Sequence, residues 1–372
     1  MSLLKEIVER IFFPNREVEF IPVLDGAFSA NQRLDEARIL GSEIIRPDDM
    51  VYGEDGALYL SSEQKIYRCT GINFESRDLL VELPGLAGGL AQMQNGHLLA
   101  CVSGHGLFQI STSGDIMRKI ESVSGKSLSC LTSVTIANDG TVYATDGSSG
   151  NLPEDWLPDL MQNRCPTGRL IAFNSDLSDA TVCIDQLNWP AGVVLSQDET
   201  EVWISESWSH RLTAYSRNNK TLRTIRKNFA GYPGRIIRLQ SGDFWITFFA
   251  VRTQLTEFVI REREFCEKMM KTVPRDLWIG PSLDGKFNYR EPTQIGRIKK
   301  LGIQKPWAPP RSYGLVARLD SSGEVIESLH SRVGGHIHGV TSVCAVREAL
   351  LALAKGRNFL VELPEAIVGR SQ

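Results

Sequence analysis

Three polar residues that are far apart in the chain carry side chains that could together act on a small molecule. Asp48 could serve as a general base or orient a histidine. Arg235 could hold a carboxylate or stabilise an oxyanion, and the imidazole of His338 titrates near neutral pH. We therefore predict a catalytic site made of Asp48, His338 and Arg235. The alternative is that Asp48 and Arg235 form an ion pair with a purely structural role.

The histidines also allow a metal site as an alternative. His336 and His338 form a His-x-His pair, and together with His105 and Asp48 they could bind zinc or another transition metal. One His-x-His pair is a weak signal, so we expect no cofactor, and Asp48 is the candidate ligand if a metal is bound. The sequence contains no Gly-x-Ser-x-Gly elbow and no phosphate-binding loop.

Composition narrows the class of protein. The chain has 372 residues, of which 42% are hydrophobic and 23% charged, and its net charge of −3 provides no positive field for nucleic acid. Its seven cysteines contain no Cys-x-x-Cys pair, so we expect reduced core residues in a cytoplasmic protein. The N-terminal run 1–14 has acidic residues within its apolar stretch and is too short to span a bilayer, so no membrane association is expected.

A repeated unit of two short apolar strands joined by a turn organises the chain. Three of its turns are Asp55-Gly56, Asn95-Gly96 and Asp139-Gly140, the dipeptides typical of tight β-hairpins. Three of the five steps between copies are 40 to 44 residues long, which fits a four-stranded propeller blade. Six copies align on the following apolar residues: Met50, Leu90, Val134, Val193, Ile236 and Val343.

Six copies predict one all-β domain over residues 1–372, a six-bladed β-propeller. The strand-like run 16–24 could supply the outer strand of the last blade and close the ring. The two longer steps imply insertions at 147–166 and 251–312. Within the second, apolar residues at helical spacing predict a helix over 254–270, with Thr253 as N-cap, so the fifth blade carries a helical insertion. A pair of β-sandwiches is the alternative fold.

Blade geometry identifies further candidates, because the start of each first strand and the end of each second strand meet at the channel mouth. We expect both insertions to lie on that face and cover the mouth; packing against the rim or an oligomer contact is the alternative. This reasoning gives a set of predicted substrate-binding residues: Asp49, His105, Ser133, Asp146, Glu206, Trp208 and Thr341.

Several motifs of the middle blades resemble a known family. The runs NDGTVYATDGSS (138–149), PTGRLIAFN (166–174) and WPAGVVLSQDETEVWISES (189–207), followed by YPGRIIRLQSGDFWIT (232–247), resemble strictosidine-synthase-like proteins. The gluconolactonase and regucalcin propellers are related. The resemblance implies a six-bladed propeller with a small-molecule site at the top of its channel. In many members it also implies calcium-dependent hydrolysis of lactones or phosphotriesters.

The positions that hold the metal in those relatives differ here. The resemblance places asparagine or aspartate where this chain has Thr132 and Ser133, Ala191, and Gly234 followed by Arg235; only Asp48 remains. It also places the catalytic glutamate of the plant enzyme at Thr341. Calcium takes about six to eight oxygen ligands, so a calcium site is disfavoured.

We therefore expect an enzyme that acts on a small-molecule ligand without a metal ion, as a lactonase-like or esterase-like hydrolase or as a lyase. A calcium-dependent lactonase or phosphotriesterase, as in the family, is one alternative. A non-catalytic ligand-binding or scaffold propeller is the other.

Overall fold

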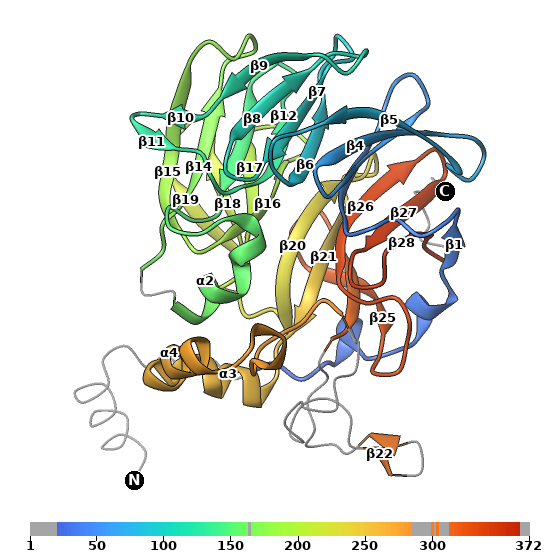
Figure 1. The fold of residues 1–372 in the computed structure, drawn as a ribbon, viewed down its shortest axis with the longest axis vertical. Coiled ribbons are helices and arrows are strands. Elements are labelled where there is room, and N and C mark those ends of the chain that lie inside the picture. The colour runs from blue at the N-terminus through green and yellow to red at the C-terminus, as the bar shows by residue number, and fades with distance from the viewer. Residues whose placement is uncertain (1–20, 163–164, 285–298, 301–302, 305–311, 365–372) are drawn as a thin grey trace.

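The structure of the protein is a computed structural model that describes residues 21–162, 165–284, 299–300, 303–304 and 312–364. Six four-stranded antiparallel sheets form the body. Each inner strand contacts the inner strands of the two neighbouring sheets, and the last blade contacts the first, so the sheets form a closed ring around an axis. The predicted all-β, six-bladed β-propeller is confirmed (Figure 1).

The first three blades follow the chain in order from the inner to the outer strand. Blade 1 consists of β2 (Pro47–Tyr52), β3 (Leu58–Ser62), β4 (Lys65–Thr70) and β5 (Ser76–Glu82). Blade 2 consists of β6 (Ala87–Gln92), β7 (Leu98–Val102), β8 (Gly106–Ile110) and β9 (Ile116–Ile120). Blade 3 consists of β12 (Leu131–Ile136), β13 (Val142–Asp146), β14 (Gly168–Phe173) and β15 (Ala180–Leu187).

The last three blades complete the ring. Blade 4 consists of β16 (Pro190–Leu195), β17 (Glu201–Glu206), β18 (Arg211–Ser216) and β19 (Leu222–Arg226). Blade 5 consists of β20 (Gly231–Arg238), β21 (Phe244–Val251), β24 (Gly314–Leu319) and β25 (Val325–Ser331). Blade 6 consists of β26 (Val340–Val346), β27 (Ala349–Ala354), β28 (Phe359–Glu362) and β1 (Arg38–Leu40). Two short hairpins lie outside the blades: β10 (Ser122–Val123) with β11 (Lys126–Ser127), and β22 (Lys299–Lys300) with β23 (Ile303–Gln304).

Ring closure comes from a different segment than the sequence predicted. The outer strand of blade 6 is β1, which pairs antiparallel with β28 through Arg38 opposite Glu362. The predicted run 16–24 does not provide it: residues 21–24 form no strand, and 16–20 lie outside the described residues. A strand from the N-terminal side still completes the last blade, so β28 is paired on both sides, by β27 and by β1.

The core lies between the blades. Six buried apolar clusters each join two neighbouring blades, as where Tyr59 of blade 1 meets Phe108 of blade 2. Because each sheet packs on both faces, second strands such as β7 are buried along their whole length, whereas the outer strand β9 is mostly exposed. This explains why second strands such as β7, with the sequence LLACV, are continuous apolar runs.

The hairpin turns show why glycine recurs between the first two strands. Gly56 has φ +76°, in the left-handed region that residues with a Cβ rarely adopt. Blade 4 has Glu199 at the corresponding turn position, with φ +54°. The repeat therefore tolerates the loss of glycine at the cost of local backbone strain.

Both insertions form helices, which Figure 1 shows together on one side of the ring. The first insertion contains η3 (Pro153–Asp155) and α2 (Trp156–Gln162). The second contains α3 (Gln254–Arg261), α4 (Arg263–Thr272) and η4 (Arg275–Leu277), and α4 contacts α2. The predicted helix 254–270 is therefore two helices, because Glu262 has a non-helical ψ of 78°. The N-cap at Thr253 is present, since its hydroxyl accepts from the amide of Thr256.

Two further features of the structure are the state of the cysteines and the length of the helices. All seven cysteines are free, but they are not all in the core: Cys165 is exposed and Cys183 half-buried. None of the helices in the described ranges is long and apolar enough to cross a membrane.

Candidate functional site

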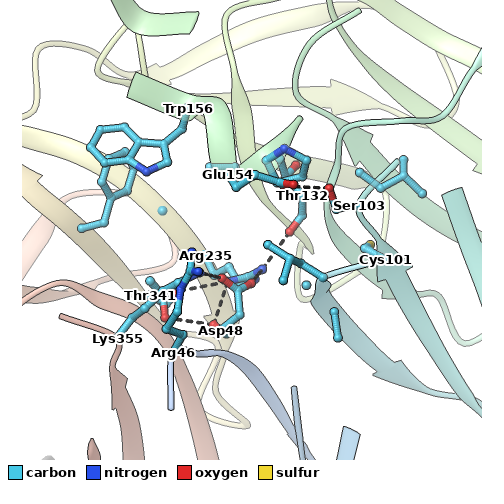
Figure 2. Close-up of a pocket in the computed structure, with 18 of the residues that line it drawn as sticks. Arg46, Asp48, Cys101, Ser103, Thr132, Glu154, Trp156, Arg235, Thr341 and Lys355 are labelled. Carbon is cyan, nitrogen blue, oxygen red and sulfur yellow. Dashed lines mark hydrogen bonds and ion pairs between the residues drawn. The ribbon is translucent and has the colours of Figure 1, made fainter. Parts of the chain in front are cut away.

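A cavity of about 170 Å³ lies at the mouth of the channel, where the first strands begin (Figure 2). All six blades line it, through Asp48, Gly88, Thr132, Ala191, Arg235 and Thr341 among others. Both insertions also line it, through Pro153, Glu154 and Trp156 of the first and Leu283 of the second. We call the described parts of the insertions, residues 147–162 and 254–284, the roof.

Arg235 lies at the centre of the cavity floor and contacts three other blades. Its Nη2 donates to Asp48 Oδ2 at 2.5 Å and to the carbonyl oxygen of Thr132 at 3.0 Å. Its Nη1 donates to the carbonyl oxygens of Asp48 at 2.9 Å and Thr341 at 3.5 Å, and its Nε lies 3.2 Å from Asp49 Oδ2. Five oxygen atoms from blades 1, 3 and 6 therefore surround one guanidinium from blade 5.

The charges of the floor determine each other's protonation. Burial alone would raise the pKa of Asp48, but Arg235 and Lys355 override it and hold that pKa far below its usual range. Burial disfavours the charge on Arg235, yet the carboxylates of Asp48 and Asp49 raise its pKa above the usual value. For Asp49 burial dominates and raises the pKa. Asp48 is thus held as a carboxylate, which makes it a weak general base.

Lys355 is a floor residue that the sequence reasoning missed. Its Nζ contacts Asp48 Oδ1, and its side chain is 24% exposed and lines the cavity. The signal was available, because Lys355 directly follows the second strand of the sixth repeat. Asp146 and Glu206 likewise lie at the ends of second strands, in blades 3 and 4.

His338 does not join the predicted catalytic group. It is 3% exposed and does not line the cavity. Its Nδ1 lies 2.7 Å from Ser312 Oγ and its Nε2 3.1 Å from the carbonyl oxygen of Arg332, while burial lowers its pKa. His338 is thus held in the packing beside blade 6, away from Asp48.

The metal alternative brings together residues that the fold keeps apart. His336 lies 3.5 Å from Asp35, and half-buried His105 does not line the cavity. Within the described ranges, no group of three or more His, Cys, Asp or Glu side chains is arranged to hold a metal ion.

Two predicted ligand-binding acids form ion pairs inside their own blades instead. Asp146 Oδ2 accepts from Arg169 Nε at 3.0 Å, and Glu206 Oε1 accepts from Arg211 Nε at 2.7 Å. In each pair the acid ends the second strand and the arginine stands opposite it on the third. Neither acid lines the cavity. The strand ends were placed correctly, but side chains alternate along a strand, and these two turn into the blade.

The remaining predicted residues surround the cavity to different degrees. Thr341 lines it and donates from Oγ1 to the carbonyl oxygen of Asp48 at 2.9 Å. Asp49 lies beneath the floor, where its carboxylate accepts from Ser342 Oγ and from the amide of Leu90. Ser133 is buried beside Thr132 and does not line the cavity.

The wall on the roof side is aromatic. Trp156, Trp189 and Phe249 line the cavity, and Trp208 stacks behind Trp189 with ring centroids 5.1 Å apart. The indole N–H of Trp208 donates to Asp159 of α2 at 2.8 Å. The predicted ligand residue Trp208 therefore supports the wall and ties it to the roof.

The roof also contacts blades 2 and 6 at the edges of the cavity. Glu154 accepts a hydrogen bond from Ser103 of blade 2 at 2.7 Å. On blade 6, the backbone of Leu283 packs against Gly356, where an added Cβ would lie 1.9 Å from the Leu283 carbonyl oxygen. Figure 2 shows Glu154 and Ser103 together at one end of the cavity, with the charged floor at the other.

Comparison with known proteins identifies the chain's relatives. Residues 132–220 match the strictosidine synthase family, and residues 26–68 match the N-terminal family of strictosidine synthase-like proteins. The adipocyte plasma membrane-associated protein of Danio rerio is 24% identical over 250 residues, which cover 62% of this chain and 60% of that protein. The protein STRICTOSIDINE SYNTHASE-LIKE 6 of Arabidopsis thaliana is 26% identical over 225 residues, covering 57% and 60%. The matches thus span about 60% of the length of these relatives.

Solved structures share the fold. A gluconolactonase from Xanthomonas campestris superposes with a TM-score of 0.58 at 16% identity, covering 89% of this chain and 91% of that one. A calcium-binding regucalcin from Agrobacterium tumefaciens gives 0.58 at 12% identity, covering 90% and 96%. The chain is therefore similar in sequence to strictosidine synthase-like proteins, and it shares the six-bladed β-propeller fold of the gluconolactonase and regucalcin structures.

Proposed function

We propose that the chain is a metal-independent, lactonase-like or esterase-like hydrolase that acts on a small organic molecule in the cavity at the channel mouth. One observation carries the proposal: a fixed set of charges, Asp48 between Arg235 and Lys355, forms the floor beneath an aromatic wall. A mostly apolar cavity with a few convergent polar groups is typical of small-molecule sites. The fold shared with a gluconolactonase supports the same class of ligand.

Independence from metal follows from what fills the centre of the floor. The oxygens of Asp48, Asp49, Thr132 and Thr341 that converge there are engaged by the guanidinium of Arg235. A divalent cation at this place would be repelled by Arg235 and Lys355. Arg235 thus supplies a fixed positive charge where the resemblance implies a metal.

The chemistry is addition of water to an ester or lactone carbonyl. As water adds, negative charge develops on the carbonyl oxygen, and a fixed cation of the floor stabilises it. The bond between carbonyl carbon and alkoxy oxygen then breaks, and the proton from water ends on the departing oxygen. Asp48 remains ionised throughout and holds the cations in place.

A non-catalytic ligand-binding propeller is the second candidate. It is favoured because Asp48 is held as a weak base and His338 is turned away from the cavity. Neither Asp48 nor His338 is therefore suited to take a proton from water.

A screen of lactones, carboxylic esters and phosphotriesters, each with EDTA and with added calcium, tests the proposal. We expect turnover of a lactone or ester that EDTA leaves unchanged. Asp48→Asn should abolish that turnover, while His338→Gln should retain it. Turnover that requires calcium would overturn metal independence, and ligand binding without any turnover would establish the second candidate.

A further inference from the structure

The two cations of the floor differ in how much of their hydrogen-bonding capacity the protein uses. The Nη1 and Nη2 atoms of Arg235 donate to four oxygens, and its Nε faces Asp49. A guanidinium has five N–H groups, so little remains for a ligand. Arg235 is therefore a positioning residue that joins blades and fixes Asp48.

Lys355 has the opposite arrangement. An ammonium group has three N–H donors, and in the described part of the chain the one contact of Lys355 Nζ is with Asp48 Oδ1. Its side chain is more exposed than that of Arg235, 24% against 13%, and it lines the cavity. Two of its donors are thus left to point toward a ligand, while Asp48 orients the group.

The charges that line the cavity limit the charge of that ligand. Three cationic side chains, Arg46, Arg235 and Lys355, are matched by three carboxylates, those of Asp48, Glu63 and Glu154. A charged ligand would lose its hydration in the cavity, and the equal numbers of cations and carboxylates there would provide no net opposite charge to offset this cost. The cavity therefore favours an uncharged ligand.

We infer that Lys355 is the residue that binds the reacting group of the ligand, and that this ligand is an uncharged ester or lactone with a flat apolar ring. Its carbonyl oxygen accepts from Lys355, and its ring packs on the wall formed by Trp156, Trp189 and Phe249. This inference rests on the proposed function of the cavity, and it names the substrate class and the residue that selects it.

Three probes that share one ring and differ in charge test the substrate class: 2-phenylacetamide is neutral, phenylacetate anionic and 2-phenylethylamine cationic. Binding is measured by the quenching of tryptophan fluorescence, because Trp156 and Trp189 line the cavity. We expect the amide to bind on the order of tenfold more tightly than either charged probe. Tighter binding of the anion or of the amine, or no quenching by any probe, would contradict the inference.

The variants Lys355→Met and Lys355→Arg test the residue. Methionine keeps a similar unbranched shape but removes the donors, so the amide should bind on the order of tenfold more weakly, whereas arginine should retain binding. Lys119→Met is the matched control, because it makes the same change at an exposed lysine of the outer strand β9 that does not line the cavity, and it should leave the affinity for the amide unchanged. An unchanged affinity for the amide in Lys355→Met would contradict the assignment of Lys355 as the binding residue. Should that variant fail to fold, the ranking of the probes on the unmodified chain still decides the substrate class.

The binding experiment separates this inference from the proposed function. If the probes bind in a way that depends on Lys355 but no ester is turned over, the proposed hydrolase function is contradicted and the proposed ligand site is supported. If Lys355→Met still turns over an ester or lactone, the proposed role of Lys355 is contradicted and the proposed hydrolase function is supported.

Discussion

Two buried arginine–carboxylate pairs of this propeller have different surroundings. Arg169 with Asp146 joins adjacent strands of blade 3, and the side chains are 4% and 1% exposed. Arg235 with Asp48 lies on the axis, where the same residue types join blades 5 and 1 and reach the backbone of blades 3 and 6. We refer to these as the blade pair and the axial pair.

The two arginines differ in the hydrogen bonds that they donate outside the ion pair. Arg169 donates to one further oxygen, the carbonyl of Ser127, whereas Arg235 donates to three backbone carbonyls on three blades. A buried ion pair adds little net stability when both partners can be replaced together by apolar residues. An arginine that also satisfies the carbonyls of several elements cannot be replaced in this way.

The largest predicted effect is therefore that of Arg235→Met. It leaves Asp48 and Asp49 without their shared cation and the carbonyls of Thr132 and Thr341 without that donor. We expect a loss of about 5 kcal/mol in the free energy of unfolding, measured by urea unfolding followed by tryptophan fluorescence. Arg235→Lys keeps the charge and should recover part of the loss. If Arg235→Met lowers the free energy of unfolding by less than Arg169→Met does, the axial pair is not more important for stability than the blade pair.

The second prediction concerns the blade pair. Arg169→Met alone should cost about 3 to 5 kcal/mol, because it leaves the buried carboxylate of Asp146 unpaired. Combining it with Asp146→Leu should recover most of that loss, since two apolar side chains then pack in the blade. The same urea titration measures both variants. The corresponding double change at the axis, Asp48→Leu with Arg235→Met, should remain strongly destabilised, and equal recovery at the two places would remove the distinction.

The comparison also explains how much of the molecule could be predicted from the sequence. The period of the repeat and the Asp55-Gly56 type of turn are local signals, and they determined the six blades correctly. The closing strand β1 could not be chosen, because Arg38–Leu40 is three residues long and acquires its role only by pairing with β28. The number of strands is thus encoded locally, while ring closure depends on contacts distant in sequence.

The candidate site was predictable to the level of strand ends, but not to the level of side chains. The start of β2 and the middle of β20 bring Asp48 and Arg235 together as the geometry suggested. Asp146 and Glu206 stand at similar strand ends, yet third-strand arginines draw them into their own blades. Which acid faces the channel depends on the partner opposite it, and Arg169 is separated from Asp146 by an insertion that hides the pairing in the sequence.

The smallest predicted effect is a pH dependence of the free energy of unfolding, which differs between a buried histidine of blade 5 and the axial carboxylate. His330 of blade 5 is fully buried, with Nδ1 3.0 Å from Tyr313 Oη and Nε2 2.9 Å from Ser328 Oγ, and burial lowers its pKa from 6.5 to about 4. The folded chain thus binds fewer protons than the unfolded one between these values. The stability from neutral His330 is present above pH 6.5 and is lost as the pH falls toward 4, by about 3 kcal/mol in all.

The axial carboxylate should respond only at lower pH. The pKa of Asp48 is depressed in the folded chain, so its contribution persists to about pH 4, the usual range of an aspartate, and is lost below it. His330→Gln should therefore flatten the dependence of unfolding free energy on pH between 6.5 and 4, as measured by urea titrations at several pH values. Gln94→Ala is the control, because that exposed side chain does not titrate and its replacement should leave the slope unchanged. A slope that stays the same in His330→Gln would mean that other groups carry the acid sensitivity in this window, and it would contradict the role given to His330.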